Sequence, residues 1–302
     1  VRLFMNKNYA DIPCETIVTS ITNATRMERI FSEYHPDYVF HAAAYKHVPM
    51  MEDNPAEAVQ NNIYGTRVIA DMAVKYGTRK FVMISTDKAV NPTNVMGCSK
   101  RICEIYCQAL NKAIVDGEVK GVTQFVTTRF GNVLGSNGSV IPIFKKQIAM
   151  GGPITVTHPD IIRFFMLIPE ACKLVLEAGT MGKGGEIFVF DMGKPVRIAD
   201  LAKRMIALSG VDGIDIKYVG LRDGEKLFEE VLNDKEATIP THHPKIMVAK
   251  VREYPYELAR KNEEDLYQLS FTYDDMAIVK KMKEIVPEYK SQHSKYAELD
   301  NN

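Results

Sequence analysis

The first half of the chain alternates short apolar runs with amphipathic stretches of helical length. The apolar runs predict strands at 16–19, 38–40, 80–84 and 124–128, and the amphipathic stretches predict helices at 25–34, 55–76 and 95–115. Strands that alternate with helices of this length are typical of a parallel sheet covered by helices on both faces. The pattern therefore predicts the α/β fold class.

The second half has a less regular pattern. Residues 131–138 are rich in Gly, Ser and Asn, which indicates a binding loop. Strands are predicted at 186–190 and 214–219 and a helix at 198–208, and the polar residues from Ser291 onward are predicted to fray. We expect a first domain at 1–130. Residues 131–302 would form a mainly substrate-binding α/β region, with the last sheet strand, near 186–190, returning to the first domain.

Composition excludes several classes of protein. The 302 residues include 38 Lys+Arg and 38 Asp+Glu, so bulk charge gives no reason to expect a nucleic-acid partner. No apolar run approaches the roughly 18–20 residues of a membrane span, and no signal peptide is evident. Five cysteines in no paired pattern favour a reducing, cytoplasmic location over a disulfide framework.

The first candidate chemistry follows the strand at 80–84. Ser85, Thr86, Asp87 and Lys88 stand at its carboxyl end, where ligands bind in open α/β sheets. Met96 and Lys100 follow at helical spacing i and i+4, so they share one helix face. Taken alone, Ser-Thr-Asp is more often a helix-capping turn than a site, and Met96 is a core residue. Their joint placement favours a site.

Longer motifs make the pattern specific. The segments 85–100, 40–55, 129–140 and 222–227 resemble, in this order, those of nucleotide-sugar 4,6-dehydratases of polysaccharide biosynthesis, the CapD-like branch of the extended short-chain dehydrogenase/reductases. The resemblance runs from about residue 16 to the C-terminus. It implies a Rossmann-like doubly wound parallel sheet that is N-terminally incomplete, with a smaller C-terminal substrate-binding region.

One departure from the superfamily concerns proton transfer. The superfamily pattern Tyr-x-x-x-Lys is here Met96-x-x-x-Lys100, and a thioether can neither take nor give a proton. The substitution weighs against a 4-epimerase or a simple dehydrogenase. Proton removal from the sugar 4-hydroxyl is left to Thr86, a water or Lys100, and the sequence does not choose among them.

The resemblance implies NAD as cofactor, with hydride leaving C4 of the sugar, water lost across C5–C6 and hydride returning to C6. In this interpretation Asp87 is the acid and Lys88 the base, and Lys100 holds the nicotinamide ribose. Both roles need shifted pKa values, since Asp87 must hold a proton and Lys88 must lose one, and their adjacency makes their titrations coupled. The cofactor-binding candidates are Ser20, Ile21, Ala42, Ala43, Ala44, Lys46, Asn62, Ser85 and Lys100.

UDP-N-acetylglucosamine is the substrate that the resemblance implies, together with a homo-oligomer. The substrate-binding candidates are Lys46, His47, Asn132, Ser136, Ser139, Arg163, Arg222 and Glu225, the two arginines for the diphosphate. His47 could equally cap or pack a helix, and either arginine alone could be a surface charge.

Two other side-chain pairs do not indicate chemistry. Adjacent His242 and His243 point apart and lack a suitably spaced carboxylate, so no metal is assigned. Cys103 and Cys107 at i, i+4 indicate a small apolar helix stripe.

A glycine-rich dinucleotide turn does not occur in this sequence. The resemblance aligns residues 16–19 with the family's third strand, so about 45–60 residues of a βαβ unit would precede Val1. We therefore expect this chain alone to bind NAD weakly and to have an altered sheet edge. Ser20 stands where the family often has an Asp near the adenine. Relatives with the Met variant often have an N-terminal membrane region, so membrane association would come only from a segment absent here.

Three functions remain in competition at this stage. The first is a 4,6-dehydratase or its catalytic segment. The second is a non-catalytic fragment that binds nucleotide sugars. The third is a UDP-sugar 4-epimerase, which Met96 disfavours.

Overall fold

The computed structural model describes residues 2–136, 138–229 and 238–301. Its centre is a six-stranded sheet in the order β1-β2-β3-β8-β12-β11. The first four strands run parallel, and β12 and β11 are antiparallel to their neighbours. The strands are β1 (Tyr38–His41), β2 (Lys80–Ile84), β3 (Gln124–Arg129), β8 (Ile187–Phe190), β11 (Thr238–Pro240) and β12 (Ile246–Ala249). The predicted α/β class with a mainly parallel sheet is confirmed.

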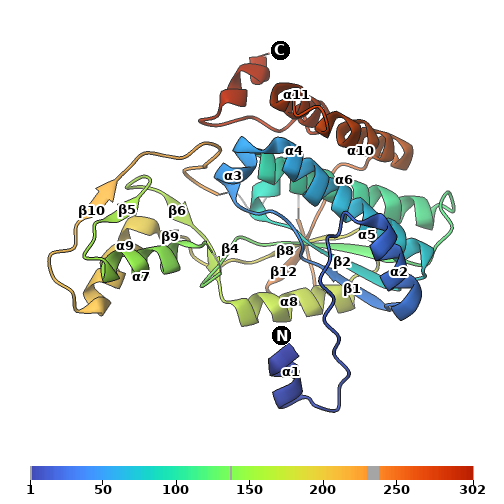
Figure 1. Ribbon diagram of the computed structural model, residues 1–302, viewed down its shortest axis with the longest axis horizontal. Helices are drawn as coiled ribbons and strands as arrows, with labels where there is room; N and C mark the ends of the chain where they lie inside the picture. The colour runs from blue at the N-terminus through green and yellow to red at the C-terminus, as the bar shows by residue number, and fades with distance from the viewer. Residues whose placement is uncertain (1, 137, 230–237, 302) are drawn as a thin grey trace.

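Helices cover both faces of this sheet (Figure 1). In β2, Phe81 and Met83 pack into one core and Val82 into the other, because successive strand residues point to opposite faces. All three are fully buried, as expected for a strand covered on both sides. The larger core contains residues of α2 (Ala24–Tyr34), α5 (Gly65–Lys75), α6 (Val95–Val115), α10 (Tyr256–Ser270) and α11 (Asp275–Ile285), and the smaller core contains residues of α8 (Ile168–Met181).

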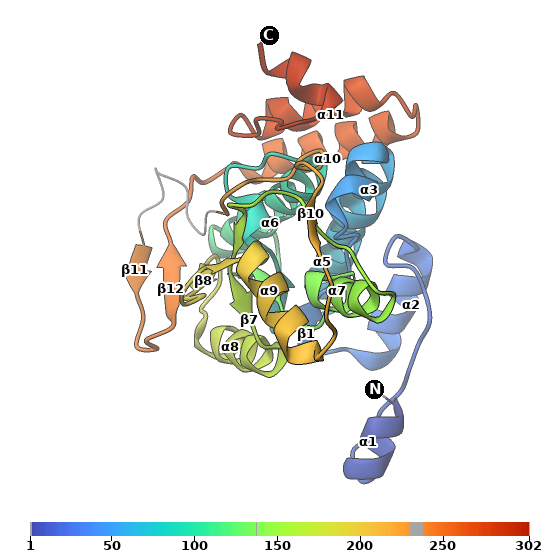
Figure 2. The same cartoon turned by 90° about the vertical axis from the view of Figure 1, so that its left-hand side faces the viewer.

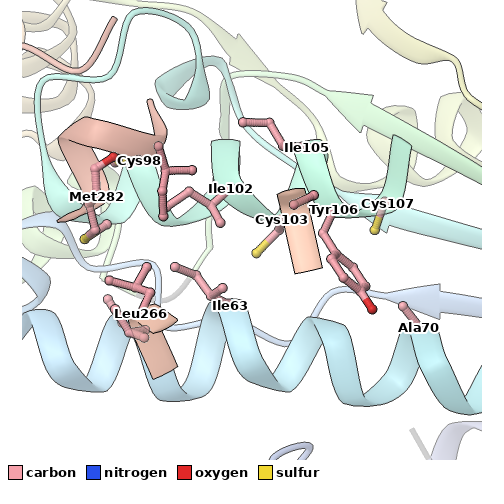
Figure 3. Close-up of a cluster of buried hydrophobic side chains, with 14 of the residues drawn as sticks. Ile63, Ala70, Cys98, Ile102, Cys103, Ile105, Tyr106, Cys107, Leu266 and Met282 are labelled. Carbon is pink, nitrogen blue, oxygen red and sulfur yellow. Dashed lines mark hydrogen bonds between the residues drawn. The ribbon is translucent and has the colours of Figure 1, made fainter. Parts of the chain in front are cut away.

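Helix α6 is the central helix of the larger core. It begins where the Asn94 side chain accepts a hydrogen bond from the Gly97 amide at 2.7 Å, which caps the first turn. Figure 3 shows Cys103 and Tyr106 on the side of α6 that faces the helix carrying Ile63. Cys103 is fully buried in this cluster and Cys107 is 1% exposed. The predicted small apolar stripe on this helix is confirmed.

The helix predicted at 55–76 consists of three parts. After α3 (Val48–Asp53), it runs through α4 (Pro55–Glu57), a π-helix η1 (Ala58–Tyr64) and α5. The π-helix carries Asn62, whose buried side chain accepts from the Tyr45 amide at 2.7 Å and donates to the Tyr45 carbonyl at 3.0 Å. This interruption of the α-helix therefore fixes the loop that follows β1.

A smaller lobe lies to one side of the sheet, at the left in Figure 1 and facing the viewer in Figure 2. Its core joins α7 (Val140–Ala149) and α9 (Ile198–Ser209) to strands β5 (Ile154–Val156) and β10 (Ile216–Tyr218), which pair in parallel. Two further short ladders share no strand with the central sheet. They are β4 (Asn132–Val133) with β7 (Phe165–Met166), and β6 (Ile162–Arg163) with β9 (Val196–Arg197).

Two predictions about strands are wrong. Residues 16–19 are extended but pair with no strand in the described part of the chain, and Val18 is 94% exposed. An isolated extended segment has no ladder partner for its amides, so it is no strand. The strand near 186–190 does return to the sheet, as β8 beside β3, but it is not the last sheet strand, because β12 and β11 continue the sheet beyond it. The short α1 (Arg2–Asn8) contributes no buried residue.

The prediction of a frayed C-terminus is also wrong. Residues Lys295–Asn301 form the 3₁₀-helix η3, and Tyr296 is fully buried. The Tyr296 hydroxyl donates to the Glu52 carbonyl at 3.0 Å, and the Ser294 hydroxyl donates to the Glu52 carboxylate at 2.7 Å. The polar composition of this segment reflects specific partners and not solvation.

Among the described residues, no helix combines the length and the apolar character that crossing a bilayer requires.

Candidate active site

A cavity of about 500 Å³ lies between the sheet and the smaller lobe. Its wall includes residues that follow the carboxyl ends of β1, β2 and β3, which is where a parallel sheet positions ligands. Most predicted site residues line it: Ala42, Ala44, Lys46, His47, Ser85, Thr86, Lys88, Met96, Lys100, Asn132, Ser136, Ser139, Arg163, Arg222 and Glu225. The structure thus brings together residues from four separate motifs.

The turn after β2 presents the central groups. Asp87–Ala89 form the 3₁₀ turn η2, and the Thr86 hydroxyl accepts from the Lys88 amide at 3.3 Å. The Asp87 amide donates to the Phe130 carbonyl at 3.2 Å, which ties this turn to the end of β3. Gly97 allows α6 to approach, since a Cβ there would lie 2.1 Å from the Lys88 carbonyl oxygen.

Asp87 lies behind the cavity wall and not on it. Its side chain is fully buried, and its Oδ1 accepts from the Thr86 hydroxyl at 2.8 Å and from Lys88 Nζ at 3.1 Å. The other oxygen, Oδ2, is buried without a hydrogen-bond partner. Burial, with the nearby Glu229 carboxylate, raises the pKa of Asp87 above its ordinary value. Asp87 therefore contacts the cavity through two side chains that line it, Thr86 and Lys88.

Lys88 is held by three acceptors. Its Nζ lies 3.1 Å from Asp87 Oδ1, 3.2 Å from Glu229 Oε1 and 3.4 Å from Asn132 Oδ1. An ammonium has three N–H donors, so each of them has a protein partner. Burial acts to lower the pKa of Lys88, but the carboxylates of Asp87 and Glu229 outweigh it and the pKa is raised. The expected shift of Lys88 toward its neutral form is therefore wrong for the protein without ligands, because two anions face its ammonium.

Glu229 is a site residue that the sequence analysis missed. Its side chain is 2% exposed, lines the cavity, and contacts both Lys88 and Arg163. It lies two residues beyond the motif at 222–227, so an acidic residue close behind a motif was the available signal. Burial favours its neutral form, but Lys88 and Arg163 outweigh burial and lower the pKa of Glu229.

Met96 and Lys100 line the cavity from α6, as their spacing predicts. Lys100 is 5% exposed, and its Nζ has no hydrogen-bond or ion-pair partner among the described residues. Burial lowers its pKa. An unpaired buried ammonium facing a cavity fits a ligand with hydroxyl or phosphate oxygens, such as a dinucleotide.

The other predicted cofactor-binding residues divide into two groups. Ala42 and Ala44 line the cavity, and their small side chains leave the backbone accessible. Ala43, Asn62, Ser20 and Ile21 are not in its wall. Asn62 acts behind it by fixing Tyr45, and Ile21 packs against Gly65, where a Cβ would lie 2.5 Å from Ile21 Cδ1.

The loop at 131–139 brings polar groups to the cavity. Lys46 Nζ donates to the Ser136 hydroxyl at 3.4 Å, which joins this loop to the segment after β1. The Ser139 hydroxyl is buried without a hydrogen-bond partner. His47 is the N-cap residue of α3 but makes no side-chain capping bond, so capping does not explain it.

The two arginines differ in their surroundings. Arg163 is paired with Glu225 at 3.1 Å and with Glu229 at 3.5 Å. In contrast, the Arg222 guanidinium lines the cavity and has no partner among the described residues. Arg222 is thus the arginine whose fork is available to a phosphate.

Gly224 fixes the position of the loop that carries Arg222. Its φ is +73°, and an added Cβ would lie 2.5 Å from Asn94 Cβ. We expect Gly224→Ala to raise KM for a ligand of the cavity, because the loop must move away from α6. Gly213→Ala is the matched control, since Gly213 has a φ of +76° with open space around it. Steady-state kinetics measure both, and an equal KM in the two variants would contradict the placement.

Ser85 is hydrogen-bonded to a buried ion-pair network that lies next to the cavity. Its hydroxyl donates to Glu104 at 2.7 Å, and Glu104 is paired with Arg129 at 2.6 Å and Arg101 at 3.1 Å. Burial favours the neutral acid, but the two arginines outweigh it and lower the pKa of Glu104. Ser85 therefore supports the turn in addition to lining the cavity.

Comparison with known proteins identifies the family. A family model described as polysaccharide biosynthesis protein matches residues 3–251. The chain belongs to this family. It is a CapD-like member within the extended short-chain dehydrogenase/reductases, as the motifs predicted.

Among the described residues, no group of His, Cys, Asp and Glu has the arrangement of a metal site.

Relatives of similar sequence include a capsule protein and an epimerase. The capsular polysaccharide biosynthesis protein CapD of Staphylococcus aureus is 53% identical over 253 residues, which cover 83% of this chain and 41% of CapD. A UDP-glucose 4-epimerase of Rickettsia canadensis is 40% identical over 202 residues, 66% of this chain and 57% of the epimerase. The chain thus spans less than two thirds of either relative.

Solved structures agree on the fold. Pen from Bacillus thuringiensis aligns with a TM-score of 0.74 and 32% identity, covering 84% of this chain and 78% of Pen. DesIV, a dTDP-glucose 4,6-dehydratase of Streptomyces venezuelae, aligns with a TM-score of 0.64 and 21% identity, covering 75% and 73% of the two chains. The second similarity shows a shared fold alone.

Proposed function

We propose that this chain is the catalytic part of a nucleotide-sugar 4,6-dehydratase that converts UDP-N-acetylglucosamine to a UDP-4-keto-6-deoxy sugar in surface polysaccharide biosynthesis. The observation that carries the proposal is the Thr86-Asp87-Lys88 turn at the cavity. It places a buried carboxyl of raised pKa 3.1 Å from the Lys88 nitrogen at the cavity wall, so that one proton passed between them gives an acid and a base side by side. An elimination across C5–C6 needs both an acid and a base at one site.

In this proposal each residue has a separate catalytic or binding role. Asp87 holds the proton for the departing C6 hydroxyl, and the Thr86 hydroxyl lies between that carboxyl and the cavity. Transfer of one proton from Lys88 Nζ to Asp87 Oδ1, 3.1 Å away, gives a neutral amine and a carboxylic acid together. The amine then removes the C5 proton, which the C4 ketone has made acidic, and the Asp87 proton leaves with the C6 hydroxyl as water. Arg222 and the polar groups of the 131–139 loop bind the nucleotide sugar.

NAD is the cofactor in this proposal, and it supplies a temporary acceptor for the hydride from C4 when bound. Lys100 and the backbone at Ala42 and Ala44 would hold it, since they line one cavity with the Thr86-Asp87-Lys88 turn. The Lys100 ammonium, which has no partner in the part of the chain that the structure describes, fits this role.

The deciding experiment is to incubate the intact protein with UDP-N-acetylglucosamine and NAD⁺ and to identify the product by NMR. A 4-keto-6-deoxy product is expected. A product that differs from the substrate by inversion at C4 alone would overturn the dehydratase in favour of a 4-epimerase. The 40% identity to a relative named UDP-glucose 4-epimerase makes that the second candidate. Binding of the nucleotide sugar without turnover would instead show a non-catalytic binding protein.

Met96 provides a test of the unusual position in the motif. Met96→Leu keeps the volume and the apolar character, so we expect kcat to remain within a few-fold of wild type. Lys100→Met removes the cavity ammonium and is expected to lower kcat by at least about 10²-fold. Assay of 4-keto product formation measures both. A large loss in Met96→Leu would show that the thioether takes part in the reaction.

A further inference from the structure

The segment after Arg222 adds a carboxylate to the proposed acid and base. Glu229 Oε1 lies 3.2 Å from Lys88 Nζ, on a loop 141 positions further along the chain than Lys88. Asp87 Oδ1 lies 3.1 Å from the same nitrogen. Two carboxylates, with side chains 0% and 2% exposed, therefore share one ammonium whose side chain is 17% exposed.

The two carboxylates are not equivalent. Glu229 also faces Arg163, whose Nε is 3.5 Å away, so two cations stabilise its ionised form. Asp87 has Lys88 as its cation and is fully buried. Because like charges at one site cannot both be ionised cheaply, the negative charge is expected to reside on Glu229.

We propose that Glu229 is a positioning residue of the Asp87–Lys88 pair, which fixes the Lys88 ammonium and sets the pH range in which the pair works. This inference rests on the proposed function. The charged groups around the pair are Asp87 and Lys88 on η2, Arg163 on β6, and Glu225, Lys226 and Glu229 on the loop after Arg222.

The direction of the effect follows from charge alone. An anion beside Lys88 favours its ammonium form and disfavours ionisation of Asp87. Glu229 therefore raises both apparent pKa values of the coupled pair, whichever proton leaves first. Removal of the Glu229 charge is expected to lower both apparent pKa values of the Asp87–Lys88 pair.

Glu229→Gln tests this inference in the intact protein. The amide keeps the shape of the side chain and removes its charge. We expect both limbs of the kcat–pH profile to move to lower pH by about one unit, because a unit charge at this distance shifts a pKa by roughly 1–3 units. A lower kcat with both limbs unmoved would indicate a purely structural role and would overturn the inference.

Two further variants serve as controls, because they are expected to move the limbs of the kcat–pH profile differently from Glu229→Gln. Arg163→Met removes a cation from the same cluster, so the limbs are expected to move to higher pH. Glu225→Gln removes a carboxylate that contacts Arg163 but is not paired with Lys88, and its limbs are expected to move less than those of Glu229→Gln. A displacement of the same sign in Arg163→Met and Glu229→Gln would contradict the charge argument.

A second readout is independent of turnover. The rate at which acetic anhydride acetylates Lys88, followed by the mass of its peptide, reports the fraction of neutral amine at each pH. We expect the midpoint to fall in Glu229→Gln, and an unchanged midpoint would overturn the inference. Failure of the proposed function would instead show as the absence of a 4-keto product in wild type while the acetylation midpoint still moves.

Discussion

Lys88→Met is expected to lower kcat by about 10³-fold, while the dissociation constant of the nucleotide sugar stays within a few-fold of wild type. The methionine side chain fills similar space but cannot accept the C5 proton. Glu229 keeps Arg163 as its cation, and Asp87, which loses its own, is expected to be neutral. Product formation gives kcat, and calorimetric titration with the UDP-sugar gives the binding constant.

The control for this prediction is a lysine away from the cavity. Lys203→Met changes an exposed residue of α9 that contacts Asp200, and it is expected to leave kcat unchanged. A Lys88→Met protein with wild-type turnover would exclude Lys88 as the base. Loss of binding together with turnover would instead show that Lys88 holds the substrate.

Arg129→Met is expected to destabilise the protein by about 3–5 kcal/mol, because it removes a partner from a fully buried carboxylate. Arg129 and Glu104 both have side chains that are 0% exposed. Arg101 remains beside Glu104 but does not replace both interactions of the Arg129 guanidinium, through Nε at 2.8 Å and NH2 at 2.6 Å. Urea denaturation measures the loss as a lower midpoint.

An exposed ion pair is the matched control for stability. Lys112 contacts Asp116 on the surface of α6 at 3.1 Å, and Lys112→Met is expected to change the free energy of unfolding by less than about 1 kcal/mol. If Arg129→Met lowered the urea midpoint no more than Lys112→Met does, the buried network would not be the support that its geometry indicates.

The sequence predicts best where local signals agree. The bounds of β2 and α6 match the prediction to the residue, since β2 is a buried apolar run and Asn94 caps α6. The cavity residues were also found, because they follow strand ends or belong to long motifs.

The sequence fails where distant partners decide the structure. Glu229 belongs to the site through Lys88, and no local pattern encodes that contact. The Tyr296–Glu52 hydrogen bond joins residues 244 positions apart, so a polar tail was mistaken for a frayed one. Residues 16–19 have strand-like composition, but a strand also needs a neighbour.

The last part of the chain is bonded to the loops of the site. The Lys290 amide donates to the Pro92 carbonyl at 3.0 Å, the Gln292 amide to Thr93 at 3.2 Å, and the Gly224 amide to Gln292 at 2.8 Å. During synthesis these partners leave the ribosome after the rest of the cavity. Domains generally fold as units, so these loops of the cavity keep unpaired backbone groups until the segment 290–292 has left the ribosome. Ligand binding would thus begin only after that segment has emerged and packed against them.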